Sequence, residues 1–407
     1  MAKQNVNYLT AIDLGSAKTV ALVAEITDSG VRYVGHGQAE SKGFRKGIIV
    51  DLEKTIASVQ KAVEVAEDSC GAAVEHAMVG VAGAHIRGVN SQGGISLGTK
   101  PREITREDVR QAVERARAIA LPADRQVLHL LPQEFLLDEQ TGVREPLGMV
   151  GGKLEVKVHV VTANASATQN VVTALNRAGI HVDSTVFEPL ASADAVLRGD
   201  ERELGVCLAD IGAGSTDLIV FHEGAVVHTG VVPIGGDHFT NDVAVGLRTP
   251  LADAEKIKKL FGCAVVTRIP EGNEIEVTSV GDRPSRLMSQ RLLGEVIEPR
   301  ARELFELVRD HLRQAGVLEL CGAGTVLTGG GARLPYMAEV AESVLRKPSR
   351  LGYPTAIARM PSNLAEPEYA TAIGMVLYGH RARLATGASS DGSITGKLKS
   401  LFARRGA

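Results

Sequence analysis

Two stretches of the chain share one pattern, in which an apolar run ends at an aspartate, a glycine follows two positions later, and a second apolar run begins. In AIDLGSAKTVALVAEI the two runs are separated by Asp13 and Gly15. In LADIGAGSTDLIVFHEG they are separated by Asp210 and Gly212. β-Branched runs on either side of a short glycine-containing step are typical of a β-hairpin. Each stretch therefore predicts two antiparallel strands joined by a tight turn.

The repetition continues further along each half. HAMVGVAGAHIRG, around Gly80 and Gly83, resembles TVLTGGGARLP, around Gly329 and Gly331, because in both a short apolar strand leads into a glycine cluster. Self-similarity of this kind indicates a duplicated unit. We therefore expect two similar α/β units, each a sheet flanked by helices.

Two amphipathic stretches predict helices. Residues 52–70 space apolar side chains by three and four positions and stop at Gly71, and this set comprises Ile56, Val59, Val63 and Ala66. Residues 293–316 carry a broad apolar stripe formed by Val296, Ile297, Leu304, Leu307, Val308 and Leu312. Pro299 within the second stretch predicts a helix start or a kink.

Three segments lie outside the repeat. Residues 84–161 contain a helical stretch, where Thr105 and Asp108 have the spacing of a capping box, followed by two strand-like runs. Residues 236–298 contain two helical stretches and then the strand-like EIEVTSV. Each is expected to form a small inserted subdomain. Residues 381–396 are rich in Gly, Ser and Ala and predict a flexible linker.

Composition narrows the possible functions. With 407 residues, 44% hydrophobic and 23% charged, the chain suits roughly two to four compact units. Lys and Arg number 45 against 48 Asp and Glu, for a formal charge of −3, which excludes a strongly basic nucleic-acid-coating surface. The absence of Trp and the 3% aromatic content argue against a base-stacking platform. We therefore expect no nucleic-acid partner.

Cysteine spacing and the N-terminus point to the cytoplasm. The four cysteines have no CxxC spacing, which is inconsistent with a zinc ribbon or redox pair and predicts reduced, buried thiols, namely Cys70, Cys207, Cys263 and Cys321. The N-terminus lacks the segments of a secretory signal. No apolar run approaches eighteen residues, so membrane contact is expected to be peripheral.

The two hairpin turns are candidates for phosphate binding. A turn rich in Gly, Ser and Thr can direct several backbone N–H groups toward one anion. Matching turns in two duplicated units could hold one polyphosphate from both sides, while Asp13 and Asp210 at the strand ends could hold hydrated Mg²⁺. One such turn alone is more often ordinary hairpin chemistry. The presence of two, with glycine clusters downstream, favours the phosphate interpretation.

At this point the sequence resembles the superfamily of actin, heat-shock chaperones and sugar kinases. Residues 326–332, VLTGGGA, are similar to its adenosine motif, and residues 234–237, IGGD, to the loop that enters the helix below the nucleotide. Residues 187–193, FEPLASA, resemble the connecting segment that carries an acidic water-positioning residue. The resemblance implies an α/β protein with an actin-like ATPase fold, in which two duplicated α/β domains surround a nucleotide cleft.

Within this superfamily the sequence is most similar to the FtsA family of bacterial cell-division proteins. The similarity covers residues 8–383 and the C-terminal tail, through VLHLLPQEF, ERELGVCLADIGAGSTD, SVGDRPSR and EVIEPR. It implies subdomain 1A at residues 1–84, 163–194 and 366–385, inserted subdomain 1C at 85–162, subdomain 2A at 195–235 and 300–365, subdomain 2B at 236–299, a linker at 386–392 and a membrane-targeting amphipathic helix at 393–407.

The resemblance also assigns residues to an ATP and Mg²⁺ site. Asp13 and Asp210 would hold the metal. Phosphates, ribose and adenine would contact Gly15, Ser16, Lys18, Gly212, Ala213, Gly214, Ser215, Gly235, Gly236, Glu255, Lys258, Gly329 and Gly330. Three of these residues have simpler interpretations, since Lys18 could be an exposed hairpin lysine and Glu255 with Lys258 a surface ion pair.

Catalysis is a separate question from binding. Glu188 is the candidate for positioning the attacking water, with Asp13 and Asp210 holding Mg²⁺. The alternative for Glu188 is a carboxylate that favours a helix N-terminus. Members of the FtsA family commonly depart from Glu at this position, so slow or absent hydrolysis is expected, with nucleotide acting as a conformational ligand.

The tail GSITGKLKSLFARRGA predicts an amphipathic helix lying in a membrane interface. One helical face is apolar and is surrounded by cations suited to anionic lipid, the set being Ile394, Leu398, Leu401, Phe402, Lys397, Lys399, Arg404 and Arg405. The alternative is a helix that docks on its own protein. The preceding linker favours the membrane.

The family resemblance implies a protein that polymerises on the inner face of the cytoplasmic membrane at the division septum, anchors filaments of the tubulin-like FtsZ and recruits later division proteins. An acidic C-terminal peptide of FtsZ would meet the region of Arg283 and Arg286, although loop arginines are often only solvated. Three alternatives remain: a small-molecule kinase, a heat-shock-type chaperone, and a pilus-associated actin-like adaptor. Only about twenty residues follow the last core segment, which disfavours the chaperone.

Overall fold

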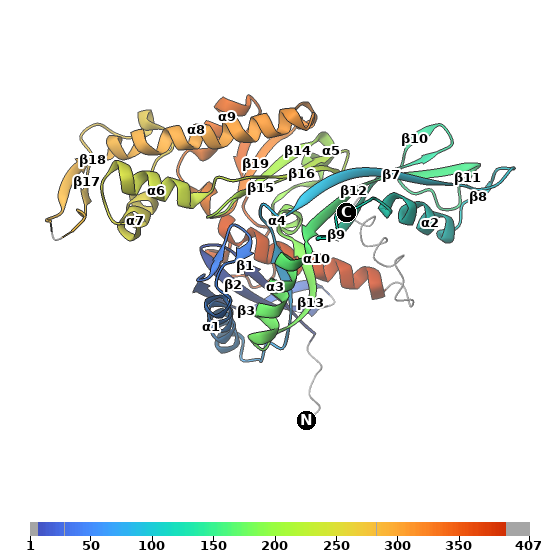
Figure 1. Ribbon diagram of the computed structural model, residues 1–407, viewed down its shortest axis with the longest axis horizontal. Helices are drawn as coiled ribbons and strands as arrows, with labels where there is room; N and C mark the ends of the chain where they lie inside the picture. Colours follow the sequence, from blue (N-terminus) through green and yellow to red (C-terminus); the bar gives the residue numbers. More distant parts are fainter. Residues whose placement is uncertain (1–6, 28, 282, 388–407) are drawn as a thin grey trace.

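The computed structural model describes residues 7–27, 29–281 and 283–387. Two α/β domains lie one above the other in Figure 1, and an inserted subdomain extends from each side of the upper one. The predicted linker beyond residue 387 and the whole predicted membrane helix lie outside the described residues. Among the described residues, no helix combines the length and hydropathy needed to cross a membrane.

The first domain is built on a five-stranded sheet of order β13-β6-β1-β2-β3. Its strands are β1 (Tyr8–Leu14), β2 (Lys18–Thr27), β3 (Gly30–Glu40), β6 (His76–Val81) and β13 (His181–Phe187). β1, β2 and β3 pair antiparallel, whereas β1, β6 and β13 pair parallel. The small β4 (Phe44–Arg45) and β5 (Ile48–Ile49) pair separately.

The second domain repeats this topology strand for strand, in the order β16-β15-β14-β19-β20. Its strands are β14 (Val206–Ile211), β15 (Thr216–His222), β16 (Ala225–Val232), β19 (Gly324–Thr328) and β20 (Ser349–Leu351). β14, β15 and β16 pair antiparallel, as β1, β2 and β3 do, and β14, β19 and β20 pair parallel, as β1, β6 and β13 do. The predicted duplication and both predicted hairpins are therefore confirmed.

Helices on the outer faces close the two cores. α1 (Leu52–Cys70) and α3 (Ala165–Arg177) cover the first sheet, and α8 (Gln290–Gln314) and α9 (Met337–Leu345) cover the second. The Asp51 side chain caps α1 at its start, and Gly71 ends it in the left-handed conformation with φ 68°. All four apolar residues predicted to face the core from α1 are buried.

The second predicted helix needs two corrections. α8 starts at Gln290, with the Ser289 hydroxyl accepting from the Arg291 N–H, so Pro299 lies inside the helix and does not start it. Four stripe residues are buried, but Leu307 is 38% exposed and faces away from the core. The stripe is narrower than predicted because the covered sheet contacts only one side of the helix.

Two helices pack against each other between the sheets. α4 (Glu188–Val196) follows the last strand of the first sheet, and α10 (Ala370–Gly387) follows the last strand of the second. A Cβ placed on Gly374 would lie 1.9 Å from the Ala191 carbonyl oxygen, so the contact requires glycine. α10 includes Arg381 and extends to Gly387, which corrects the predicted linker because these residues are helical.

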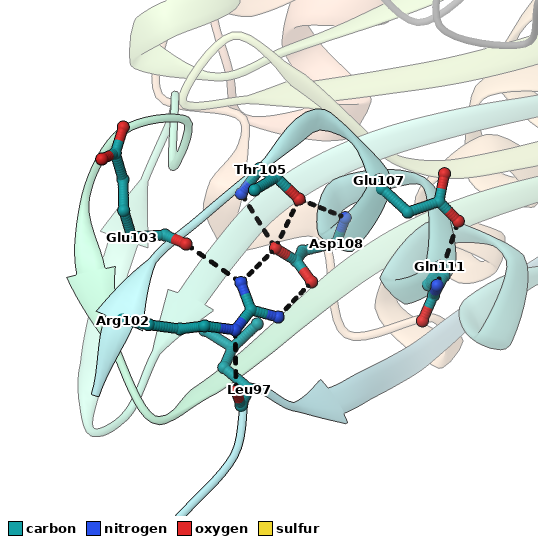
Figure 2. Close-up of polar contacts among 7 residues, drawn as sticks. All are labelled: Leu97, Arg102, Glu103, Thr105, Glu107, Asp108 and Gln111. Atoms are coloured by element: carbon teal, nitrogen blue, oxygen red, sulfur yellow. Dashed lines mark hydrogen bonds and ion pairs between the residues drawn. The ribbon is translucent and has the colours of Figure 1, made fainter. Parts of the chain in front are cut away.

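The first inserted subdomain is a four-stranded sheet of order β10-β9-β12-β7 covered by α2 (Arg106–Arg117). Its strands are β7 (Arg87–Ser96), β9 (Arg125–Leu137), β10 (Gln140–Val143) and β12 (Lys153–Asn164), with β8 (Arg102–Glu103) and β11 (Val150–Gly151) paired beside it. Figure 2 shows the predicted capping box, in which Asp108 accepts from the Thr105 N–H at 2.9 Å and also binds Arg102 through two contacts of 2.7 Å.

The second inserted subdomain contains α6 (Gly236–Gly246), α7 (Leu251–Phe261), β17 (Glu274–Val277) and β18 (Arg286–Ser289). It reaches away from the first inserted subdomain in Figure 1. The short α5 (Gly199–Leu204) precedes β14.

Candidate functional site

A cavity of about 490 Å³ lies between the two domains, where β1 and β14 end. Ligand pockets usually occupy about 300–1,000 Å³, so this one can hold a small molecule. Fifteen of the predicted site residues line it, from both hairpin turns, α4, α6, α7 and the glycine cluster after β19: Asp13, Gly15, Ser16, Lys18, Glu188, Asp210, Gly212, Ala213, Gly214, Ser215, Gly236, Glu255, Lys258, Gly329 and Gly330. The chain folds so that segments more than 300 residues apart meet here.

The two hairpin turns face each other across the cavity. A Cβ placed on Gly214 would lie 3.1 Å from Ser16 Oγ, so the turns approach closely. Two predicted donors are used inside the turns, since the Gly15 N–H donates to the Lys18 carbonyl at 3.1 Å and the Gly212 N–H to the Ser215 carbonyl at 3.0 Å. Those two N–H groups are therefore not available to a phosphate, which corrects the prediction for Gly15.

The donors that remain belong to neighbouring residues. Within the described part of the chain, the backbone N–H groups of Ser16, Ala213 and Gly214 make no hydrogen bond to protein. Each turn is closed by one internal hydrogen bond, which leaves its tip free to bind an anion. Gly235 does not line the cavity, because a Cβ there would lie 2.6 Å from the Ala213 carbonyl oxygen, which places Gly235 behind the second turn.

Three carboxyl groups gather at the floor of the cavity, from Asp13 on β1, Glu188 on α4 and Asp210 on β14. Burial, reinforced by the charge of Asp210, raises the pKa of Asp13 to about 7. Burial, followed by the charges of Asp13 and Asp217, raises the pKa of Glu188 well above its usual range. A divalent cation among these groups would offset the repulsion and favour their ionised forms, so the donor set fits hydrated Mg²⁺.

Hydroxyl groups orient Asp210. The Ser192 hydroxyl on α4 donates to Asp210 Oδ2 at 2.7 Å, and the Thr371 hydroxyl on α10 donates to the same oxygen at 3.3 Å. Burial raises the pKa of Asp210, and these two hydrogen bonds oppose that rise. Asp210 is therefore held by both helices of the central pair.

The position of Glu188 is compatible with both predictions made for it, and its role in orienting a water stays a prediction. It is the first residue of α4, where a carboxylate suits the helix dipole, and it also lines the cavity. Gly80 makes room for it, because a Cβ on Gly80 would lie 2.7 Å from Glu188 Cγ.

Sequence reasoning missed Asp217. This side chain is 8% exposed and accepts from the Gly83 N–H of the other domain at 3.0 Å and from the Ser215 hydroxyl at 3.2 Å. Burial raises its pKa to about 7. In the first hairpin the matching position is Val20, opposite Asp13, so the repeat offered no signal. An aspartate inside an apolar strand was the one clue.

Sequence reasoning also missed Glu368, which bridges the domains at the cavity wall. Its Oε2 lies 3.3 Å from Lys18 Nζ of the first hairpin, and its Oε1 accepts from Arg333 Nη1 at 2.9 Å. The Lys18 ammonium also lies 3.6 Å from the centre of the Tyr369 ring. Lys18 is therefore not a simple exposed hairpin lysine.

Glu255 and Lys258 form an ion pair of 2.6 Å that lines the cavity. Lys258 Nζ donates to the Gly236 carbonyl at 3.0 Å and to the Thr240 hydroxyl at 2.8 Å, which fastens α7 to the first turn of α6. The pair thus supports the cavity wall as well as facing it.

The two arginines predicted to bind a partner differ in their surroundings. Arg286 donates to Ser279 Oγ at 2.7 Å and to the Leu247 carbonyl, so it joins β18 to the end of α6. Arg283 is exposed. Their role toward a partner stays a prediction.

Two domains of identical strand order around an interdomain polar cavity define an actin-like protein. Solved structures agree on this fold: the PilM–PilN type IV pilus biogenesis complex matches with TM-score 0.65 and 18% identity, covering 91% of this chain and 98% of the other. MreB5 of Spiroplasma citri bound to ADP matches with TM-score 0.57 and 13% identity, covering 95% and 99%.

Sequence comparison then gives the family. Residues 207–374 match the family described as cell division protein FtsA, and residues 83–162 match the SHS2 domain inserted in FtsA. FtsA of Pseudomonas aeruginosa is 45% identical over 377 residues, covering 92% of this chain and 90% of that protein. FtsA of Escherichia coli K12 is 37% identical over 404 residues, covering 97% and 96%. The chain belongs to the FtsA family and is an actin-like cell-division protein.

Proposed function

We propose that this chain binds ATP with Mg²⁺ between its two domains, polymerises at the inner face of the cytoplasmic membrane, and there anchors FtsZ filaments and recruits later division proteins. The observation that carries the nucleotide part is the pair of hairpin turns facing one cavity across the domain interface. The family carries the cell-division part.

The geometry supports a division of labour around a bound nucleotide. The free N–H groups of Ser16, Ala213 and Gly214 bind phosphate oxygens from opposite sides. Asp13 and Asp210 bind the hydrated cation, which supplies charge stabilisation at the phosphates. Gly329 and Gly330 leave space for the adenine.

Hydrolysis depends on Glu188. To orient a water, its carboxyl must be ionised, yet burial and the neighbouring carboxyl groups raise its pKa. Cation binding at Asp13 and Asp210 removes part of that repulsion. We infer slow turnover, in which nucleotide acts mainly as a conformational ligand.

The membrane part rests on the sequence of residues 393–407. Burial of one large apolar side chain contributes about 1.5–3 kcal/mol and each basic residue near anionic lipid about 1 kcal/mol, while ordering costs about 1–2 kcal/mol per residue. A single tail therefore binds weakly. Alignment of several tails on a filament raises avidity by about 10² to 10⁴, so polymerisation and membrane binding reinforce each other.

Two variants test the two halves of the proposal. Asp210→Ala should weaken Mg²⁺-dependent ATP binding at least tenfold in a fluorescent-nucleotide titration, and unchanged affinity would remove Asp210 from the site. Deletion of residues 393–407 should abolish sedimentation with vesicles rich in phosphatidylglycerol while ATP binding persists. The deletion variant is the control for the first experiment, and the full parent chain under the same conditions is the control for the second.

FtsZ anchoring is tested by co-sedimentation of FtsZ filaments with the same vesicles. FtsZ should sediment only when the full chain is present, and an FtsZ lacking its C-terminal peptide should stay in solution. Transfer of phosphate from ATP to a sugar would instead favour the kinase alternative.

A further inference from the structure

Three side chains that can bind a transition metal meet at the edge of the first sheet. His76 is the first residue of β6, and His181 is the first residue of β13. These strands are parallel, and their register places His76 opposite His181, with Asp183 two positions further along β13. The cavity lies where β1, parallel to β6, ends, so the cluster sits at the opposite end of the sheet.

The three side chains already contact one another. His76 Nδ1 lies 2.9 Å from Asp183 Oδ1, and the imidazole rings of His76 and His181 are 5.0 Å apart between centroids, at 70°. One ligand atom from each residue lies within 4.8 Å of the other two. Tetrahedral zinc with bonds of about 2.0–2.2 Å needs ligand atoms about 3.4 Å apart. All three side chains are exposed, so small rotations can close that difference.

The chemical types of the three ligands indicate which metal ions they would bind. Two imidazoles and one carboxylate suit zinc and neighbouring first-row ions, whereas Mg²⁺ and Ca²⁺ prefer oxygen ligands. Three protein ligands leave one tetrahedral position open. Backbone pairing holds the two histidines opposite each other, because the His181 N–H donates to the Glu75 carbonyl at 2.8 Å, and Asp183 lies at an irregularity of the ladder between Val182 and Ser184.

We propose that His76, His181 and Asp183 bind one zinc-class divalent cation, with the fourth position occupied by water. The cation ties the edge strand β13 to β6 at their first residues. The competing interpretation is that His76 and Asp183 form only a surface hydrogen-bonded pair, which predicts no specific metal binding.

The test is a Zn²⁺ titration of the full, untagged chain by calorimetry, in excess Mg²⁺ to saturate the carboxyl groups of the interdomain cavity. One equivalent should bind. His181→Ala and Asp183→Asn should each lower the affinity at least tenfold. Glu75→Gln is the matched control, because it removes an exposed carboxylate next to His76 that is outside the cluster, and its affinity should equal that of the parent.

Two further measurements separate this site from other ligands. Co²⁺ in place of Zn²⁺ should give the visible absorption of tetrahedral coordination, and His181→Ala should abolish it. The same titration of Cys70→Ser, which removes a half-buried thiol, should keep the single equivalent. The proposal is overturned if the parent chain binds no Zn²⁺ in the micromolar range, or if His181→Ala and Asp183→Asn bind it within twofold of the parent.

Discussion

Asp217→Asn should stabilise the protein in a way that grows with pH. The amide keeps the shape of the carboxylate, and its oxygen can still accept from the Gly83 N–H. Burial raises the pKa of Asp217 from 3.8 to about 7 in the folded chain. Below about pH 4 the carboxyl is protonated in both the folded and unfolded chains and nothing is lost.

Between about pH 4 and pH 7 only the unfolded chain ionises Asp217, so the free energy of unfolding falls as pH rises. A difference of about three pKa units corresponds to about 4 kcal/mol above pH 7, an upper value because neighbouring carboxyl groups share the same protons. Asp217→Asn has no ionisable group at this position and so removes this loss in the free energy of unfolding. Its advantage over the parent should therefore be near zero at pH 4 and reach its maximum above pH 7.

The assay is the midpoint of thermal unfolding of both chains across pH 4.5 to 8, without nucleotide. The variant should unfold several degrees above the parent at pH 8, and the two curves should converge toward pH 4.5. Asp68→Asn, at an exposed position, is the control and should show no such trend. A variant that is less stable than the parent at pH 8, or an offset that does not change with pH, would refute the reasoning.

Three other substitutions have defined outcomes. Asp108→Ala removes the acceptor of the capping box and should lower the free energy of unfolding by about 1–2 kcal/mol in chemical denaturation. This loss should fade at low pH, because the bond to Arg102 holds the pKa of Asp108 well below its usual range and the contribution of the carboxylate is lost as it becomes protonated. An unchanged free energy of unfolding would contradict the cap. Glu368→Gln should raise ADP affinity severalfold at low salt by freeing Lys18, and weaker binding in a nucleotide titration would contradict this. Gly374→Ala should cost about 1–3 kcal/mol in thermal unfolding, since the backbone it meets cannot move aside, and full stability would refute the close contact.

Local sequence signals predicted the parts of the fold that local forces determine. The hairpins follow from β-branched runs around glycine turns, and α1 follows from apolar spacing between an aspartate cap and Gly71. The duplication predicted that the two turns would face a common cavity. The predicted start of the linker was wrong, because residues 381–387 have the linker's composition of small residues and yet continue α10.

Contacts between segments that are distant in the sequence could not be predicted from local sequence patterns. Glu368 lies 350 positions from Lys18 in the chain, and neither residue shows in its own surroundings that the other is a partner. The use of the Gly15 N–H inside its own turn was also hidden, because the same Gly-Ser sequence suits a closed turn and an anion site. The residue types therefore predicted which residues line the site, and the hydrogen bonds of the structure showed which of their N–H groups are already used.

The hydroxyl contacts of Asp210 connect the cavity to α10, the helix that precedes the proposed membrane helix in the sequence. The hydroxyl oxygens of Ser192 and Thr371 lie 2.7 and 3.3 Å from Asp210 Oδ2 and 2.9 Å from each other, so the three groups share two hydroxyl hydrogens and a movement of this carboxylate bears on both α4 and α10. Thr371 is in the first turn of α10, and the proposed membrane helix follows a few residues after that helix ends. α10 also packs on the first sheet, although it follows the last strand of the second. The last described helix before residues 393–407 in the sequence is therefore in contact both with the proposed cation site and with the first domain.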